Sequence, residues 1–389
     1  MARPRATRVV GVVMVALALA FAAGCSGSDQ TAPTTFTVPP ITSPLTATTA
    51  PSVLTTATQP APRANEAGLS PGFNLSLSTP ELDVALDGLA ATKVRWLRVD
   101  FDWSVIQAGG PSSYDWSRTD RIVEAARARN LSIIALATYT PDWARPPGTP
   151  DKNPPTDPDD YARFVSSAAQ RYASLGVTTW EIWNEPNVST FWYPKPDPER
   201  YTALLVRASA AIKHVEPGAT IISGGLAPAS DDARGSQIDG RTFLTRVYAA
   251  GGGRAFDAVG LHPYSFPNLP LFPADYNTFL NTPAVYQVMV DHGDAAKRIW
   301  GTEVGAPTAG GGGAVTDAMQ SGILVQAYRQ WTAWPFTGPL IWFAYADSGS
   351  DSFDREEHFG LVDAGGRPKP AFAVFVRVVA GLLARQPAP

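Results

Sequence analysis

Two glutamates at the ends of apolar, tryptophan-rich segments are the residues of this 389-residue sequence best suited to chemistry. Glu185 follows residues 178–184, where aromatic and β-branched residues alternate with others, and Pro186 then prevents further strand pairing. Glu303 ends a second apolar run that begins at residue 298, before a Gly/Pro stop at 305–307. Such a pair can break a glycosidic bond, with one carboxyl protonating the leaving oxygen and the other acting as nucleophile or base.

A single glutamate is more often a solvated surface residue. Here both glutamates lie in segments with little charge, which a merely solvated side chain has no reason to prefer. Strict alternation along a strand would aim Asn184 and Glu185 at opposite faces. For both to serve one pocket, the strand must bulge or finish at this point.

The segment Asn184-Glu185-Pro186, together with Thr302-Glu303, resembles the acid/base and nucleophile motifs of the clan A glycoside hydrolases. Within that clan it is most similar to families 39 and 5, from about residue 72 to the C-terminus. The resemblance implies a (β/α)8 TIM barrel in a single catalytic domain and hydrolysis with retained configuration. It further implies Glu185 as acid/base, Glu303 as nucleophile, and Asn184 as the partner of the sugar hydroxyl next to the anomeric carbon.

Short strands alternate with helical segments along the chain, which favours a parallel sheet. We expect eight strands, at residues 73–77, 94–100, 132–138, 179–184, 220–224, 258–262, 298–303 and 340–345. Helices are expected to begin where Thr79, Asp157 and Asp197 each precede a proline, because such a residue can cap a helix with proline in its first position. The last helix is expected at about 369–384.

Polar residues at other predicted strand ends would join the same mouth of a barrel. The resemblance implies that Arg98 hydrogen-bonds the nucleophile, although a surface ion pair is the alternative for this residue. His262 and Tyr264 match the clan's His-x-Tyr pattern, which implies that Tyr264 holds Glu303 ionised and that His262 lines the pocket. A lone histidine is more often structural, but this one ends a predicted strand.

Aromatic residues near these strand ends are candidates for sugar stacking. The resemblance implies that Trp342 forms the floor under the sugar, and Tyr139 is expected to border the glycone subsite, which holds the sugar that is attacked at its anomeric carbon. For Trp143, core packing is nearly as good an interpretation. Residues 191–193, all aromatic, could extend a cleft for further sugars, although many of the 11 tryptophans must belong to the core.

The N-terminal segment reads as an export signal. Arginines at positions 3, 5 and 8 precede an apolar stretch at 9–23 and the only cysteine, Cys25. We predict a lipoprotein signal at 1–24 with lipidation of Cys25; an ordinary cleaved signal or an uncleaved anchor are the alternatives. Residues 25–65, rich in Thr, Pro and Ser, are predicted to form a disordered tether, and 66–389 the catalytic domain.

The charge and composition of the chain limit the kinds of molecule that it is expected to bind. Removing residues 1–24 takes away three arginines and no acid, so the formal net charge of −4 becomes −7, which argues against nucleic acid. We expect a monomer without cofactor or metal, acting on a carbohydrate at the outer face of the cytoplasmic membrane or after secretion. A transglycosylase and a non-catalytic carbohydrate-binding barrel are the alternative functions.

Overall fold

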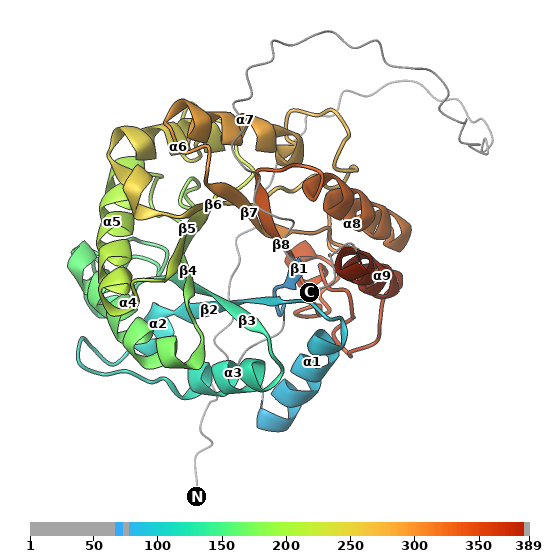
Figure 1. The fold of residues 1–389 in the computed structure, drawn as a ribbon, viewed down its shortest axis with the longest axis horizontal. Coiled ribbons are helices and arrows are strands. Elements are labelled where there is room, and N and C mark those ends of the chain that lie inside the picture. The colour runs from blue at the N-terminus through green and yellow to red at the C-terminus, as the bar shows by residue number, and fades with distance from the viewer. Residues whose placement is uncertain (1–66, 73–77, 385–389) are drawn as a thin grey trace, which may run out of the picture. The chain divides into compact units, whose positions relative to one another are not determined.

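The computed structural model describes residues 67–72 and 78–384, which include a closed barrel of eight parallel strands (Figure 1). Each strand pairs with its neighbours in chain order, and β1 pairs with β8 to close the ring. The strands are β1 (Ala67–Leu69), β2 (Trp96–Asp102), β3 (Ser132–Thr138), β4 (Thr179–Asn184), β5 (Thr220–Gly225), β6 (Ala258–Leu261), β7 (Arg298–Val304) and β8 (Thr337–Trp342). The predicted (β/α)8 TIM barrel is therefore confirmed.

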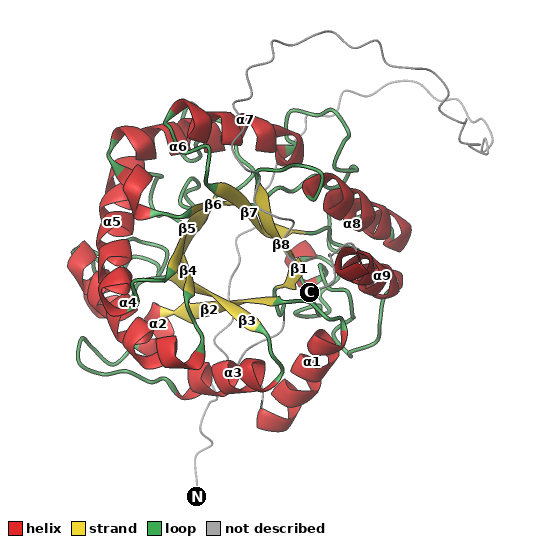
Figure 2. Ribbon diagram, in the orientation of Figure 1, coloured by secondary structure: helices red, strands yellow, loops and turns green. Residues whose placement is uncertain are grey.

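Helices surround the ring of strands (Figure 2). They are α1 (Thr79–Ala91), α2 (Trp103–Ile106), α3 (Ser117–Ala128), α4 (Pro158–Tyr172), α5 (Pro198–Val215), α6 (Gly240–Ala249), α7 (Thr278–Asp291), α8 (Asp317–Trp331) and α9 (Pro370–Ala384). Short 3₁₀ turns lie at η1 (Asp142–Ala144), η2 (Ala173–Leu175), η3 (Gly252–Ala255) and η4 (Arg355–Glu357). Within the described ranges, none of the helices has both the length and the apolarity that crossing a membrane requires.

Most strand predictions agree with the structure. The third and fourth strands have the predicted bounds, whereas the eighth lies three residues earlier than expected. The strand predicted at 73–77 falls outside the described residues, and the first strand of the ring is Ala67–Leu69. The predicted signal, Cys25 and the tether also lie outside the described residues.

Two of the three predicted helix starts are correct. The Asp157 carboxylate accepts a hydrogen bond from the Asp159 backbone N–H at 2.9 Å, and Asp197 accepts one from Arg200 at 2.9 Å. The prediction for Thr79 was wrong by one residue, because Thr79 is already helical and the residue before it is the cap.

The interior of the ring is filled by an apolar layer drawn from six strands. Its members are Trp96, Ile134, Ile222, Ala258, Trp300 and Ile341. Within this layer, the Trp96 and Trp300 rings meet edge to face at 5.3 Å. Because side chains alternate along a strand, Arg98 lies on the same inner face of β2 as Trp96. Polar groups therefore lie directly above this apolar layer, toward the carboxyl ends of the strands.

Candidate active site

The backbone at the end of β4 departs from extended geometry. Trp183 has φ +72° and Glu185 has φ +46°, a left-handed conformation that is uncommon for residues other than glycine. This departure breaks the alternation, so that neighbouring side chains both serve the mouth of the barrel. The Asn184 Oδ1 accepts a hydrogen bond from Arg98 Nη2 at 2.9 Å, while Glu185 Oε1 lies 2.7 Å from His262 Nδ1. The required bulge or strand end is thus present.

Strand β5 passes close beneath the site at Gly225. A Cβ atom at this position would lie 2.2 Å from His262 Nε2 and 2.6 Å from Thr302 Oγ1, distances that real contacts do not show. Only glycine lets the strand approach this closely. Gly225 therefore lets His262 occupy its place between the two glutamates.

Glu303, at the end of β7, has a partner at each carboxylate oxygen. Arg98 Nη1 donates to Oε1 at 2.5 Å, and the Tyr264 hydroxyl donates to Oε2 at 2.9 Å. Burial by itself would raise the pKa of Glu303, but His262, Arg98 and Tyr264 outweigh it, so that the pKa lies below its usual value. Glu303 is therefore held ionised.

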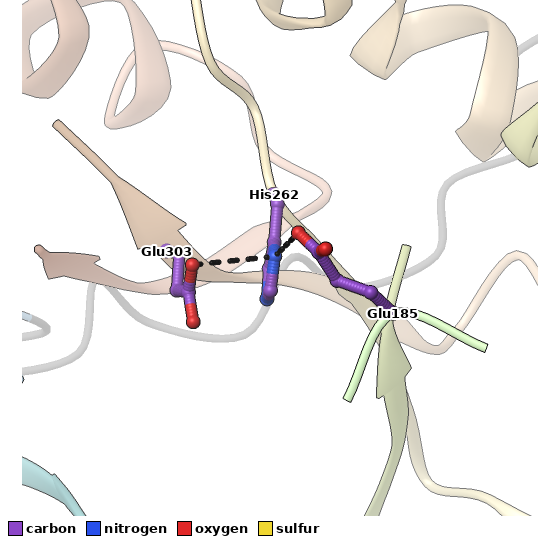
Figure 3. Close-up of side chains that lie close together, drawn as sticks. All are labelled: Glu185, His262 and Glu303. Atoms are coloured by element: carbon purple, nitrogen blue, oxygen red, sulfur yellow. Dashed lines mark hydrogen bonds and ion pairs between the residues drawn. The ribbon is translucent and has the colours of Figure 1, made fainter. Parts of the chain in front are cut away.

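Glu185 has the opposite shift. Burial is the largest cause and raises the pKa of Glu185; the charge of Glu303 adds to this effect, and the contact with His262 opposes it. In Figure 3 the two glutamates approach His262 from either side. One oxygen of each carboxyl and one ring nitrogen of His262 all lie within 4.8 Å of one another. The two carboxyls thus stand close together with pKa values shifted in opposite directions.

His262 is buried completely between these acids. Its Nδ1 lies 2.7 Å from Glu185 Oε1 and 3.4 Å from Glu303 Oε2. Burial alone would lower the pKa of His262, but the two carboxylates raise it above its usual value. His262 therefore lies between the two glutamates and contacts both.

Sequence reasoning missed Glu181, a fully buried carboxylate in the middle of β4. It lies 2.6 Å from Arg98 Nε and accepts a hydrogen bond from the Gly225 backbone N–H at 3.0 Å. Arg98 is therefore fixed from one side by Glu181 and from the other by Glu303, rather than forming a surface ion pair. The signal in the sequence was a charged residue inside an otherwise apolar strand.

The three groups Glu185, His262 and Glu303 are close enough to be considered as metal ligands. A ligating histidine usually donates its other N–H to a carboxylate or carbonyl. His262 Nε2 is buried and has no hydrogen-bond partner among the described residues. The Arg98 guanidinium on Glu303 also opposes a second cation. The donor set thus suits proton transfer better than metal binding.

Tyr139 lies at the mouth of the barrel, as predicted for a residue bordering the sugar. Its half-buried ring meets Trp183 edge to face at 6.2 Å, and the Lys152 ammonium lies 3.9 Å from the ring centre. Burial raises the pKa of Tyr139 well above its usual value, and nearby carboxylates, Glu303 among them, add to the effect. Trp143 instead packs edge-on against Trp103 at 5.7 Å, which favours its core role.

The structure does not support the stacking role predicted for Trp342. Its side chain is 0% exposed and belongs to the core between the barrel and the helices. Alternation explains this position, since Ile341 belongs to the layer inside the ring and the next residue must point outward. Phe343, half-buried and 5.4 Å from the Phe359 ring, is the next residue to face inward. Trp192 is likewise buried in the core.

A model of the cellulase family, glycosyl hydrolase family 5, matches residues 63–244, a range that includes Glu185 but ends before Glu303. A β-xylosidase from Geobacillus stearothermophilus is 31% identical over 129 residues, which cover 29% of this chain and 25% of that protein. The resemblance to clan A glycoside hydrolases is confirmed.

Solved structures of clan A glycoside hydrolases share the fold. A family 39 glycoside hydrolase from Bacteroides cellulosilyticus superposes with a TM-score of 0.66 at 22% identity, covering 82% of this chain and 64% of that one. A GH5_18 protein from Streptomyces cattleya, in complex with GlcNAc, has a TM-score of 0.65 at 18% identity, covering 85% and 83%. This chain thus spans a quarter of the curated relative and less than two thirds of the family 39 structure.

Proposed function

We propose that this protein is a retaining glycoside hydrolase, with Glu303 as nucleophile and Glu185 as acid/base. The observation that carries the proposal is the closeness of the two carboxyls, whose oxygens lie within 4.8 Å of each other. Retaining enzymes hold their carboxyls roughly 5–5.5 Å apart, whereas inverting enzymes need about 6.5–9.5 Å to admit a water. The opposite pKa shifts of the two groups add support.

In the first step, an ionised oxygen of Glu303 attacks the anomeric carbon and forms an ester bond to it. The bond between that carbon and the leaving oxygen breaks, and the proton of Glu185 passes to the leaving oxygen. Arg98 and Tyr264 hydrogen-bond the charged form of Glu303, so they keep the nucleophile ionised and oriented before attack. Asn184, fixed by Arg98, is positioned to hydrogen-bond the neighbouring sugar hydroxyl.

In the second step, a water molecule replaces the departed group. Glu185, now ionised, takes a proton from this water. The water oxygen bonds to the anomeric carbon, and the ester bond to Glu303 breaks. Forming the ester removes the negative charge of Glu303, so the pKa of Glu185 falls and suits its new task as base. The family resemblance suggests a β-linked or equivalent equatorial bond as the substrate.

A panel of poly- and oligosaccharides, digested and then sized, tests this function. We expect the wild-type protein to shorten at least one glycan, and a Glu303→Gln variant to leave the same glycan intact. Product lengths also distinguish endo from exo action and reveal any transglycosylation. If glycans bind without being cleaved, the protein is a carbohydrate-binding barrel and the proposal is wrong.

We also propose that the mature protein is attached to the outer face of the membrane through a lipid on Cys25. The Ala-Ala-Gly-Cys junction and the Thr/Pro-rich residues behind it support this localisation. A Cys25→Ser variant should move to the medium or keep its signal uncleaved. Unchanged membrane fractionation and an unchanged N-terminal mass would contradict lipidation.

A further inference from the structure

Asp100 is a carboxylate on the inner wall of the barrel for which the proposed mechanism has no use. On β2, Trp96 belongs to the layer inside the ring, whereas Leu97 and Val99 are buried in the core outside it. Side chains alternate along a strand, so Arg98 and Asp100 follow Trp96 on the inner face. The Asp100 side chain is exposed, which places it above Arg98 at the open mouth of the barrel.

The next acidic residue on this face has a structural task that Asp100 lacks. Asp102 Oδ1 accepts hydrogen bonds from the Ser104 hydroxyl at 2.6 Å and the Val105 backbone N–H at 3.3 Å, and so caps α2. Asp100 accepts no hydrogen bond from any residue that the structure describes. A carboxylate without a partner on the inner face of the barrel, at the end where the proposed catalytic residues lie, is available to bind a ligand.

Asp100 and the proposed nucleophile Glu303 are near enough for their charges to interact. The surrounding protein raises the pKa of Asp100 to about 6, chiefly by limiting its hydration; Arg98 opposes this shift, while Asp102 and Glu303 add repulsion. The charge of Asp100 also raises the pKa of Tyr139, and only burial has a larger effect on that pKa. A sugar seated between Glu303 and Tyr139 would therefore be within the field of Asp100.

A further carboxylate, Glu356 of η4, acts on the site from the loop after β8. It is half-buried, and its Oε1 lies 3.0 Å from Arg355 Nε. Its charge raises the pKa values of both Glu185 and Tyr264, although burial is the largest cause at each. Glu303 is therefore within the field of Asp100 from β2 and of Glu356 from this loop.

Three cations near the mouth, Arg98, Lys152 and Arg355, are already paired with carboxylates. Arg98 is bound by two buried glutamates, and the Lys152 ammonium lies 3.0 Å from Asp151. Arg355 contacts the glutamate next to it. Arg118, in the first turn of α3, lowers the pKa of Asp100 by less than Arg98 does. An acidic sugar next to Glu303 would thus meet carboxylates, while Arg98, the cation in contact with Glu303, is already paired with Glu181 as well.

We infer that Asp100 selects a non-acidic sugar ring at the subsite next to Glu303, by accepting hydrogen bonds from ring hydroxyls and repelling a sugar carboxylate. This inference rests on the proposed glycosidase function. Hydrogen bonds to an ionised acceptor are stronger than neutral ones, so they suit a neutral polyol. The substrate class is then a glycan of neutral or amino sugars rather than of uronic acids.

The test compares the wild-type protein with Asp100→Asn, and uses Asp102→Asn as a control with the same change of charge on the same strand. Each protein is given neutral glycans and aryl glycosides beside their uronic-acid counterparts. Mass spectrometry of the products identifies the sugar at the new reducing end, and kcat/KM is measured for both substrate classes.

We expect a non-acidic sugar at that end from the wild-type protein. Asp100→Asn should lower kcat/KM on the neutral substrate about tenfold or more and raise the relative rate on the acidic one. Asp102→Asn should lower the melting temperature through its lost cap and leave the ratio of the two rates unchanged.

A uronic acid at the new reducing end, or an unchanged ratio in Asp100→Asn, would overturn the inference and leave the glycosidase function standing. If the wild-type protein cleaves nothing in either class, the proposed function is refuted and the inference with it.

Discussion

The two glutamates of the site are held in different ways. Glu303 is fixed by side chains, with Arg98 on one oxygen and Tyr264 on the other. Glu185 is placed by left-handed backbone at the end of β4 and contacts His262 through one oxygen. The first environment favours a charge and the second a proton. Two residues of the same type thus differ in how readily they lose a proton, because different groups surround them.

Replacing Glu303 should have the largest effect, because no other group can attack the anomeric carbon. Glu303→Gln should lower turnover on the order of 10⁴-fold or more. With Glu303→Gly, azide is small enough to take the vacated place and should restore cleavage of an activated aryl glycoside with inverted product. Steady-state rates and product analysis check this; near-normal turnover by Glu303→Gln would show that another group attacks.

Replacing Glu185 should have an effect that depends on the substrate. Loss of a general acid lowers the reaction rate about 10²–10⁴-fold where the leaving group needs a proton, and by less where it does not. The Glu185→Ala variant should therefore lose most of its activity on a substrate with a natural sugar leaving group. The rate of the first step on an activated aryl glycoside should fall little. Glu199→Ala, which removes a surface carboxylate of α5 paired with Arg246, is the control. Equal losses on both substrates would contradict the acid role.

Removing one hydroxyl from the surroundings of Glu303 should have the smallest effect. The Tyr264 hydrogen bond lowers the pKa of Glu303, so Tyr264→Phe should raise that pKa and move the acid limb of kcat/KM to higher pH. The basic limb, which reports Glu185, should move less, and the loss at the optimum should be about tenfold.

Tyr201→Phe provides the matched control for this change. Its hydroxyl contacts the Ile182 carbonyl and the Gly224 N–H, outside the site, so this variant should lose stability and keep the acid limb in place. Equal shifts of the acid limb in the two variants would show that Tyr264 acts only through the fold.

The barrel and its two glutamates could be predicted because their signals are local. Residues 132–138 and 179–184 are apolar runs with clear ends, and the structure gives both strands these bounds. Helix starts at Asp157 and Asp197 needed only a capping residue before proline. Chain order alone then brought Glu185 and Glu303 to one end of the ring.

What the sequence could not supply depends on contacts between distant segments. Glu181 and Arg98 are 83 residues apart, and only the closed ring makes them a buried pair. The eighth strand begins three residues earlier than predicted, and alternation along it directs Trp342 outward into the core. Gly225 looked like an ordinary strand end until His262 was placed against it.

The most direct test of the account is the anomeric configuration of the first product, followed by NMR during cleavage by the intact enzyme. One oxygen of each carboxyl lies within 4.8 Å of the other, short of the roughly 6.5–9.5 Å at which a water attacks the anomeric carbon directly, so we expect Glu303 to bond to carbon before water does. We expect the first-formed product to have the configuration of the substrate. A first product of inverted configuration would contradict it.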